Sequence, residues 1–426
     1  TVESAVRLAN AIGRALVPPN GRVIVGKDPR VSSYMFEAAL EAGFVAAGVN
    51  VELARVMPTP SVAYLTKAMG ADLGVMISAS HNRFEDNGIK FFNRHGHKLR
   101  SEQETAVLDA LDQPIATGSA TELGRATTPW DVIEIYREFC LSTVSPGLKM
   151  PGKRIVIDCA NGASYKVGPR VFSELGDDLV SIGCSPNGTN INQGFGSTEP
   201  ELLQKTVTAL GAEVGIAFDG DGDRVIMVDH NGDIVDGDVI TLIIALDRHQ
   251  NGQLTGPVVG TLMSNLGLEH ALRDRGIEFM RTQVGDRHIL AALQEHNGII
   301  GGEDSGHIVC LDKTTTGDGI IAALQVIDVM ARTGKRLADL AGQMIHYPQT
   351  LINCPLDGQE IEPEQDELIS QAMLSAKQQL GDDGRILVRR SGTEPVMRVM
   401  VEGVDSGAVE QCAEQLADVI RQRVKS

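Results

Sequence analysis

The sequence predicts an α/β fold with three similar α/β domains of mixed or parallel sheets, then a smaller C-terminal α+β domain, around a central cleft. First, apolar strands alternate with amphipathic helices through most of the chain, which favours sheets covered on both faces. Second, strands ending near residues 25, 157 and 259 each run into a small or polar loop and then a helix. Third, the order changes to β-α-β-β-α after residue 347.

The composition argues against several classes of protein. Lys and Arg number 38 against 56 Asp and Glu, so the net charge of −18 argues against nucleic acids and anionic membranes as partners. No apolar stretch reaches the length of a membrane span. The 6 cysteines are scattered without a C-x-x-C pair, which favours a reducing compartment over a disulfide framework or a thiolate metal site. We therefore expect a soluble, cytoplasmic protein.

The first domain is expected at residues 1–129. Its first helix has an apolar face formed by Val6, Ala9, Ile12 and Leu16. A buried strand at residues 22–25 leads into a loop that nearly matches a nucleotide P-loop, but Asp28 stands where that motif needs Ser or Thr for magnesium. We exclude a P-loop for that reason. A helix over residues 34–47 follows, and a later apolar strand at residues 73–77 leads to the first candidate site.

The loop after this strand carries a hydroxyl, an imidazole and an amide on Ser80, His81 and Asn82. Small residues before them let a reactive oxygen stand out at the end of a strand, and Lys90 supplies a nearby cation that would stabilise an anion. We interpret Ser80 as a nucleophile that carries a phosphoryl group. The alternative is an ordinary surface turn, which is the commoner setting of a Ser-His pair.

The second domain is expected at residues 130–232, and it contains the strongest local motif. Asp219, Asp221 and Asp223 stand at alternate positions between two predicted strands, so their carboxylates can converge on one hard cation. A calcium EF-hand is excluded, because Arg224 replaces its glycine and no helices flank the loop. A solvated acidic turn is the alternative, but three close carboxylates without a cation would repel one another. We predict a divalent metal, with magnesium best suited to phosphate chemistry.

The third domain is expected at residues 233–346. Its glycine-rich stretch at residues 301–307 combines a carboxylate, a hydroxyl and an imidazole on Glu303, Ser305 and His307. These are the groups that hydrogen-bond sugar hydroxyls in a defined pattern. An ordinary turn remains the alternative, because loops of Gly, Ser, Thr and Asp are common.

The C-terminal domain is expected at residues 347–426. Its elements are predicted as a strand, a helix, two strands and a helix, at residues 350–353, 363–380, 386–389, 396–401 and 406–424. The turn between the last two strands combines hydroxyls, glycine backbone and guanidinium groups, which together make a phosphate cradle. The members of this cradle are Arg389, Ser391, Gly392, Thr393 and Arg398. The alternative is an exposed basic hairpin.

The four loops together resemble the motifs of the α-D-phosphohexomutase superfamily. They are similar to its phosphoserine, magnesium, sugar-binding and phosphate-binding loops, at residues 77–82, 219–224, 302–307 and 389–395. Residues 86–92 and 312–319 are similar to the branch that acts on glucosamine phosphates. Two departures stand out: Arg83 replaces a usual proline, and nothing matches the family's initial Gly-Thr-Asp-Gly-Ile-Arg-Gly segment. Because the chain starts at Thr1, we expect that residues upstream are missing.

The resemblance implies an isomerase that interconverts glucosamine 6-phosphate and glucosamine 1-phosphate, towards UDP-N-acetylglucosamine and cell-wall precursors. It implies a phosphoserine enzyme, one Mg²⁺ per active site and a glucosamine 1,6-bisphosphate intermediate. The implied catalytic residues are Ser80, Lys90, Arg30, Arg224 and His307. The implied metal ligands are Ser80, Asp219, Asp221 and Asp223. The implied substrate-binding residues are Glu303, Ser305, His307, Arg389, Ser391, Gly392, Thr393 and Arg398.

Several alternatives stay open at this level. Lys90 and His307 are equally suited to move the proton. A phosphomannomutase or phosphoglucomutase of the same superfamily would carry the same loops. A phosphosugar phosphatase and a non-catalytic phosphosugar sensor are further interpretations, although a sensor could lack the serine or the carboxylates. The expected partner is a phosphosugar, and residues 1–47 offer helical surface for a homodimer.

Overall fold

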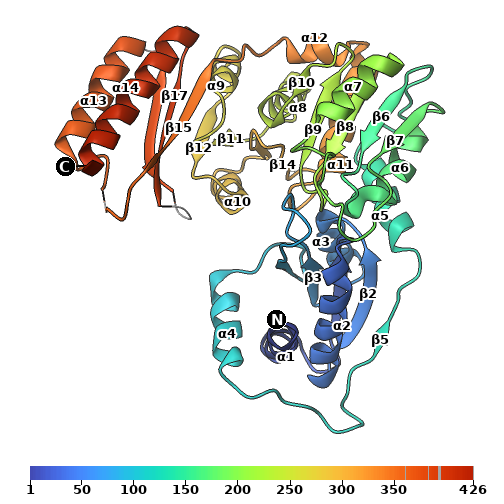
Figure 1. Cartoon of the computed structure of the whole chain (residues 1–426). Coiled ribbons are helices and arrows are strands. Elements are labelled where there is room, and N and C mark those ends of the chain that lie inside the picture. Colours follow the sequence, from blue (N-terminus) through green and yellow to red (C-terminus); the bar gives the residue numbers. More distant parts are fainter. Residues whose placement is uncertain (360, 382, 392–394, 426) are drawn as a thin grey trace. The chain divides into compact units, whose positions relative to one another are not determined.

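The computed structural model of the chain describes residues 1–426 except residues 360, 382, 392–394 and 426 (Figure 1). It separates into two compact units. The first contains Thr1–Val259 and Gly285–Gly342, and the second contains Gly260–Val284 and Gln343–Ser426. The four predicted domains, with boundaries after residues 129, 232 and 346, remain a prediction. Among the described residues, no helix has the length and apolar character needed to cross a membrane.

The first sheet has the strand order β4-β3-β1-β2-β5. Its strands are β1 (Arg22–Lys27), β2 (Asn50–Val56), β3 (Leu73–Ile77), β4 (Ile89–Asn93) and β5 (Ala126–Thr127). Its helices are α1 (Val2–Leu16), α2 (Val31–Ala46), α3 (Thr59–Ala68) and α4 (Ser101–Leu111). β1 pairs in parallel with β2 and β3, while β3 pairs antiparallel with β4. The predicted first helix and first strand are confirmed, and the second helix starts at Val31 rather than residue 34.

The second sheet has the strand order β10-β9-β8-β6-β7. Its strands are β6 (Ile155–Asp158), β7 (Leu179–Ile182), β8 (Val214–Phe218), β9 (Val225–Asp229) and β10 (Ile234–Val235). Its helical segments are α5 (Val132–Ser142), η1 (Ala163–Tyr165), α6 (Val167–Phe172), η2 (Ser173–Leu175) and α7 (Glu201–Leu210). β6 pairs in parallel with β7 and β8, and β8 pairs antiparallel with β9. The predicted strands on either side of the acidic loop are therefore confirmed as one antiparallel pair.

The third sheet has the strand order β12-β11-β13-β14. Its strands are β11 (Val258–Thr261), β12 (Phe279–Thr282), β13 (Ile300–Gly302) and β14 (Ile308–Cys310). The helices of this part of the chain are α8 (Gly237–Gln250), α9 (Leu266–Arg273), α10 (Asp286–Glu295), α11 (Gly319–Thr333) and α12 (Leu337–Ala341). α8 and α11 are buried along most of their length, as their continuous apolar sequences require.

The first three sheets repeat one topology. In each, the second strand of the order pairs in parallel with the third, and the third pairs antiparallel with the fourth: β2-β1-β3-β4, β7-β6-β8-β9 and β12-β11-β13-β14. The hairpin loop between the last two strands is residues 78–88 in the first sheet, 219–224 in the second and 303–307 in the third. These are the phosphoserine, metal and sugar loops of the sequence analysis. The predicted repeat is confirmed, and the same point of each repeat carries the candidate chemistry.

The C-terminal sheet belongs to the second unit and has the strand order β15-β17-β16. Its elements are β15 (Gln349–Pro355), α13 (Glu367–Leu380), β16 (Arg385–Arg390), β17 (Val396–Glu402) and α14 (Ser406–Lys425). β17 pairs antiparallel with both neighbours, so the predicted β-α-β-β-α order is confirmed. α13 starts later than predicted, because the Asp366 side chain accepts from the Leu368 and Ile369 amides and caps the helix there.

The core of this unit gives a direct test of the packing. Leu416 of α14 is 1% exposed, whereas Leu374 of α13 is 62% exposed. Replacing Leu416 by Ala should lower the free energy of unfolding by about 2–5 kcal/mol, because the surroundings cannot fully close the cavity. Leu374→Ala is the matched control and should change it by no more than about 0.5 kcal/mol. Urea unfolding measures both, and equal losses would contradict the assigned faces.

Candidate active site

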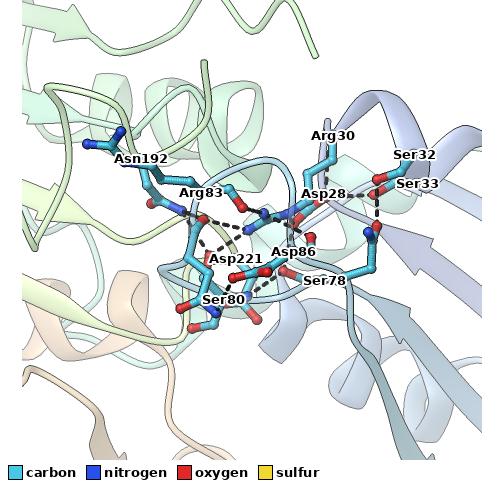
Figure 2. Close-up of polar contacts among 12 residues, drawn as sticks. Asp28, Arg30, Ser32, Ser33, Ser78, Ser80, Arg83, Asp86, Asn192 and Asp221 are labelled. Atoms are coloured by element: carbon cyan, nitrogen blue, oxygen red, sulfur yellow. Dashed lines mark hydrogen bonds and ion pairs between the residues drawn. The ribbon is translucent and has the colours of Figure 1, made fainter. Parts of the chain in front are cut away.

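Arg30 holds the loop that carries the predicted nucleophile (Figure 2). Its side chain is fully buried, and its Nε donates to Oδ2 of Asp28 at 2.7 Å. The other guanidinium nitrogens donate to backbone carbonyls of one loop, those of Ser80, Asn82, Arg83 and Asp86. A buried charged group needs acceptors for its donors. The loop carbonyls therefore accept the hydrogen bonds of Arg30, and Arg30 in turn fixes the conformation of the loop. The resemblance implied a catalytic role for Arg30, whereas in the structure its donors bind Asp28 and the carbonyls of the loop.

Two further side chains support the same backbone. Ser78 donates from Oγ to Asp28 Oδ2 at 2.7 Å and accepts from the Ser80 amide at 3.0 Å. Asn192, which is 2% exposed, donates from Nδ2 to the carbonyls of Ser80 at 2.9 Å and Asn82 at 2.8 Å. Ser80 itself has a φ of +51°, a left-handed conformation that costs a non-glycine residue energy. These hydrogen bonds hold it there.

The hydroxyl of Ser80 meets the acidic loop. Its Oγ donates to Oδ2 of Asp219 at 2.7 Å, across 139 residues of sequence. Gly220 lies close beside it, since a Cβ at that position would stand 2.6 Å from the Ser80 carbonyl oxygen. The resemblance implied that Ser80 and the acidic loop share one metal site, and in the structure the Ser80 hydroxyl contacts Asp219 directly.

Asp219, Asp221 and Asp223 form a compact cluster of buried carboxylates. One oxygen from each lies within 4.8 Å of the others. Burial, together with the charges of Asp221 and Asp223, raises the pKa of Asp219 well above its ordinary value. Oδ1 of Asp221 and Oδ1 of Asp223 are buried and find no hydrogen-bond partner among the residues that the structure describes. Orphaned buried oxygens beside a carboxylate–hydroxyl pair fit a hard divalent cation such as Mg²⁺.

Three cationic groups surround this cluster. Lys90 Nζ donates to Asp221 at 2.7 Å and to Asp223 at 3.1 Å. Burial alone would lower the pKa of Lys90, but these two carboxylates outweigh it and raise the pKa. Burial likewise opposes the charge of Arg224, and Asp219 and Asp223 raise its pKa. Lys90 and Arg224 therefore stay charged beside the carboxylates.

His307 is the third group, and it lies between two carboxylates. It is 3% exposed, with Nδ1 3.8 Å from Asp223 Oδ1 and Nε2 3.7 Å from Asp286 Oδ2. Burial would lower the pKa of His307, while Asp223, Asp286 and Glu303 together raise it above its ordinary value. The structure thus brings the predicted His307 to the metal loop, where it can hold a proton.

The sugar loop is built around Glu303. Its Oε1 accepts from the Gly285 amide at 2.8 Å, and Ser305 Oγ lies 3.5 Å from its other oxygen. Gly306 has a φ of +93°, and a Cβ there would stand 2.2 Å from the Val225 carbonyl, so only glycine fits. The Val225 amide donates to the Gly306 carbonyl at 3.0 Å, which fastens the sugar loop to the end of the metal loop.

The predicted phosphate cradle lies in the second compact unit. Arg389 of β16 and Arg398 of β17 are direct cross-strand partners. Together with apolar side chains such as Met263 and Leu351 they line a pocket of about 110 Å³. Ser391 is described and donates its amide to the Val396 carbonyl at 2.9 Å. The predicted members Gly392 and Thr393 lie outside the described residues.

Sequence reasoning missed several residues of this site. Asp28 served only to exclude a P-loop, although it anchors both Arg30 and Ser78. Thr59 was not singled out, yet its hydroxyl donates to Asp221 Oδ2 and its amide to the Asp221 carbonyl at 2.8 Å. Two more carry no local motif and were not singled out: Asn192 and Asp286. Their partners are remote in sequence, so no short pattern marks them.

Comparison with known sequences identifies the class of protein. The chain matches four consecutive phosphoglucomutase/phosphomannomutase domains: alpha/beta/alpha domains I, II and III at residues 1–116, 138–232 and 236–347, and the C-terminal domain at 351–419. It therefore belongs to the phosphoglucomutase/phosphomannomutase family, which confirms the resemblance found in the motifs. Among individual proteins, it is 52% identical over 423 residues to phosphoglucosamine mutase of Legionella pneumophila (strain Corby), spanning 99% of this chain and 92% of that one.

Solved structures agree with the fold. A phosphoglucomutase/phosphomannomutase family protein from Burkholderia thailandensis superposes with a TM-score of 0.80 at 22% identity, over 100% of this chain and 94% of the other. The Aspergillus fumigatus N-acetylphosphoglucosamine mutase, solved with GlcNAc-6P and magnesium, has a TM-score of 0.66 at 18% identity. That match covers 85% of this chain and 91% of the other. At these identities the likeness shows the fold alone.

The role of Arg30 can be tested by a conservative change. Arg30→Lys keeps the charge but removes the planar fork, so the loop carbonyls lose donors and the Ser80 hydroxyl shifts. We expect kcat to fall on the order of 100-fold, as small misplacements of reacting groups do. Steady-state kinetics measures the loss, and hydrogen exchange should rise in residues 78–88. Arg22→Lys, at a half-exposed arginine, is the control. Wild-type turnover by Arg30→Lys would contradict the role.

The metal site gives a second test. Chelation of divalent ions should abolish turnover, and Asp221→Asn should raise the Mg²⁺ concentration for half-maximal activity about tenfold or more, because one buried anionic ligand is lost. Added Mg²⁺ should also raise the Tm of the wild type, since a ligand that binds only the folded state stabilises it. Asp233→Asn, at an exposed position in the same domain, is the matched control. An unchanged metal requirement in Asp221→Asn would contradict the three-carboxylate site.

Proposed function

We propose that this protein is a phosphoglucosamine mutase, which interconverts glucosamine 6-phosphate and glucosamine 1-phosphate. The observation that carries the proposal is the 2.7 Å hydrogen bond from the Ser80 hydroxyl to Asp219, at the edge of a buried carboxylate cluster. A serine in that position can carry a phosphoryl group beside a divalent cation. The high identity to a phosphoglucosamine mutase over nearly the whole chain supports this choice of sugar.

In the proposed reaction, the enzyme starts with a phosphoryl group on Ser80. This group passes to the free C1 hydroxyl of glucosamine 6-phosphate: the hydroxyl proton leaves to a base, the P–O bond to Ser80 breaks and the Ser80 oxygen takes up a proton, and glucosamine 1,6-bisphosphate forms. The bisphosphate then turns over in the site, and its C6 phosphoryl group passes to Ser80 while the Ser80 hydroxyl loses its proton and the C6 oxygen gains one. The products are glucosamine 1-phosphate and the phosphorylated enzyme, so the overall change is an isomerisation.

Asp219, Asp221 and Asp223, with an oxygen of phosphorylated Ser80, would hold one Mg²⁺. The ion would neutralise charge on the transferring phosphoryl group. Arg224 adds a fixed positive charge next to the same carboxylates. Arg30 acts indirectly: it positions Ser80 by donating hydrogen bonds to the backbone of the nucleophile loop.

For the proton we favour His307 over Lys90. Both are near the carboxylates, but Lys90 donates to two of them and its pKa is raised, so it rarely gives up its proton. Burial lowers the pKa of His307, but Asp223, Asp286 and Glu303 outweigh it and raise the pKa. An imidazole is the side chain that most often transfers protons near neutral pH. Lys90 then serves as a fixed cation.

Substrate binding is proposed to divide between two loops. Glu303 and Ser305, with His307, would bind sugar hydroxyls. The phosphate that does not react would be bound by Arg389, Ser391, Gly392, Thr393 and Arg398. We further propose a cytoplasmic enzyme, because its six cysteines are free, and helical surface in residues 1–47 suits a homodimer.

The central test replaces the nucleophile. Ser80→Ala should reduce mutase turnover on the order of 1000-fold or more, because the covalent route is lost. Ligand binding and Tm should stay near wild type. Ser119→Ala, at an exposed serine in the same predicted domain, is the control. A coupled assay for glucosamine 1-phosphate measures turnover, and peptide mass spectrometry locates the phosphate. Sizeable turnover by Ser80→Ala, or full activity with Ser80 never phosphorylated, would refute the mechanism.

A further inference from the structure

The proposed substrate carries a positive charge that none of the roles assigned above recognises. Glucosamine phosphates bear an amino group on C2, which is protonated near neutral pH, whereas glucose phosphates bear a neutral hydroxyl there. A site that prefers the amino sugar needs an acceptor for this cation, and a carboxylate that stays ionised is the strongest acceptor available. The carboxylate must lie beside the group that binds the neighbouring sugar hydroxyl.

The acidic side chains around the sugar loop differ in how well they could bind the C2 ammonium. Asp219, Asp221 and Asp223 are committed to the metal site. Glu303 already accepts from the Gly285 amide and is assigned to a hydroxyl. Burial and the neighbouring acids Asp236 and Glu303 raise the pKa of Asp304 to about 6, so its negative charge is easily lost.

Asp286 differs from all of these. Burial would raise its pKa, but His307 and Lys98 outweigh burial and hold the pKa of Asp286 below its ordinary value. It is the first residue of α10 and directly follows Gly285, whose amide holds Glu303. Its Oδ2 lies 2.5 Å from Lys98 Nζ and 3.7 Å from His307 Nε2. Its Oδ1 makes no hydrogen bond with any residue in the described part of the chain.

We propose that Asp286 binds the C2 ammonium of the amino sugar and so determines the preference for glucosamine phosphates. This inference rests on the proposed function and adds the residue that selects the sugar. The carboxylate adjoins both predicted sugar-binding groups, Glu303 through Gly285 and His307 directly. Lys98 is 39% exposed in its side chain, so its ion pair is weak and yields to a better placed cation.

A purely structural role would also account for an Asp at this position. A carboxylate in the first turn of a helix is stabilised by the helix dipole, and α10 has no side-chain cap at Gly285. Such a role would affect all substrates alike. The decisive quantity is therefore the ratio of kcat/KM for glucosamine 6-phosphate to that for glucose 6-phosphate.

The experiment compares the wild type with three variants of the full chain. Asp286→Asn keeps the shape and removes the charge, and we expect it to lower the ratio at least tenfold. Asp286→Glu keeps a carboxylate and should retain part of the preference. Lys98→Met removes the ion-pair partner but leaves the Asp286 carboxylate, so the ratio should stay within twofold of the wild type, or rise. Thermal unfolding confirms that each variant is folded.

Equal losses for both sugars in Asp286→Asn would overturn the inference, as would a fall of the ratio in Lys98→Met as large as in Asp286→Asn. A calorimetric titration of glucosamine 6-phosphate and glucose 6-phosphate into Ser80→Ala, with and without Asp286→Asn, measures the same preference without turnover. If the wild type fails to convert glucosamine 6-phosphate, the proposed function fails, and this titration still decides the role of Asp286. Loss of the amino-sugar preference in binding supports it, and an unchanged preference refutes it.

Discussion

A buried arginine needs an acceptor for each of its donors, and the candidate active site contains one that has them. Arg30 uses Asp28 and the carbonyls of the nucleophile loop. The left-handed backbone at Ser80 costs roughly 1–2 kcal/mol, whereas an unpaired buried charge costs several kcal/mol. Because an unpaired Arg30 would destabilise the fold more than the strained backbone does, the loop keeps the strain at Ser80. Its hydroxyl is thereby placed against Asp219.

The metal loop is the centre to which the other loops are joined. Ser80 reaches it through Asp219. The sugar loop is joined to the metal loop by the hydrogen bond from the Val225 amide to the Gly306 carbonyl. The start of α11 is joined to it by the Gly319 amide, which donates to the Gly222 carbonyl at 3.1 Å. Each connected loop closes the same antiparallel hairpin of a repeated sheet. One simple topology, used three times, thus delivers three different chemical functions to one site.

The candidate site packs three carboxylates together and places three basic side chains beside them. The chain has a net charge of −18, and three of its carboxylates are packed together in the interior. Lys90, Arg224 and His307 lie beside them and have raised pKa values for that reason. Buried acidic oxygens still lack partners in the described structure. Under the proposed function, a divalent cation and a phosphorylated serine would complete this arrangement, because each supplies the charge that the other lacks.

The sequence alone determined the alternation of strands and helices, the three-fold repeat and the loops that carry Ser80, the aspartates and Glu303. These depend on neighbouring residues, so local patterns reveal them. Only the tertiary structure decided which groups meet. Asn192 contacts Ser80 from 112 residues away, and Thr59 contacts Asp221 from 162 residues away. Such contacts follow from how strands pair and sheets pack, and a single sequence carries no short-range signal for them.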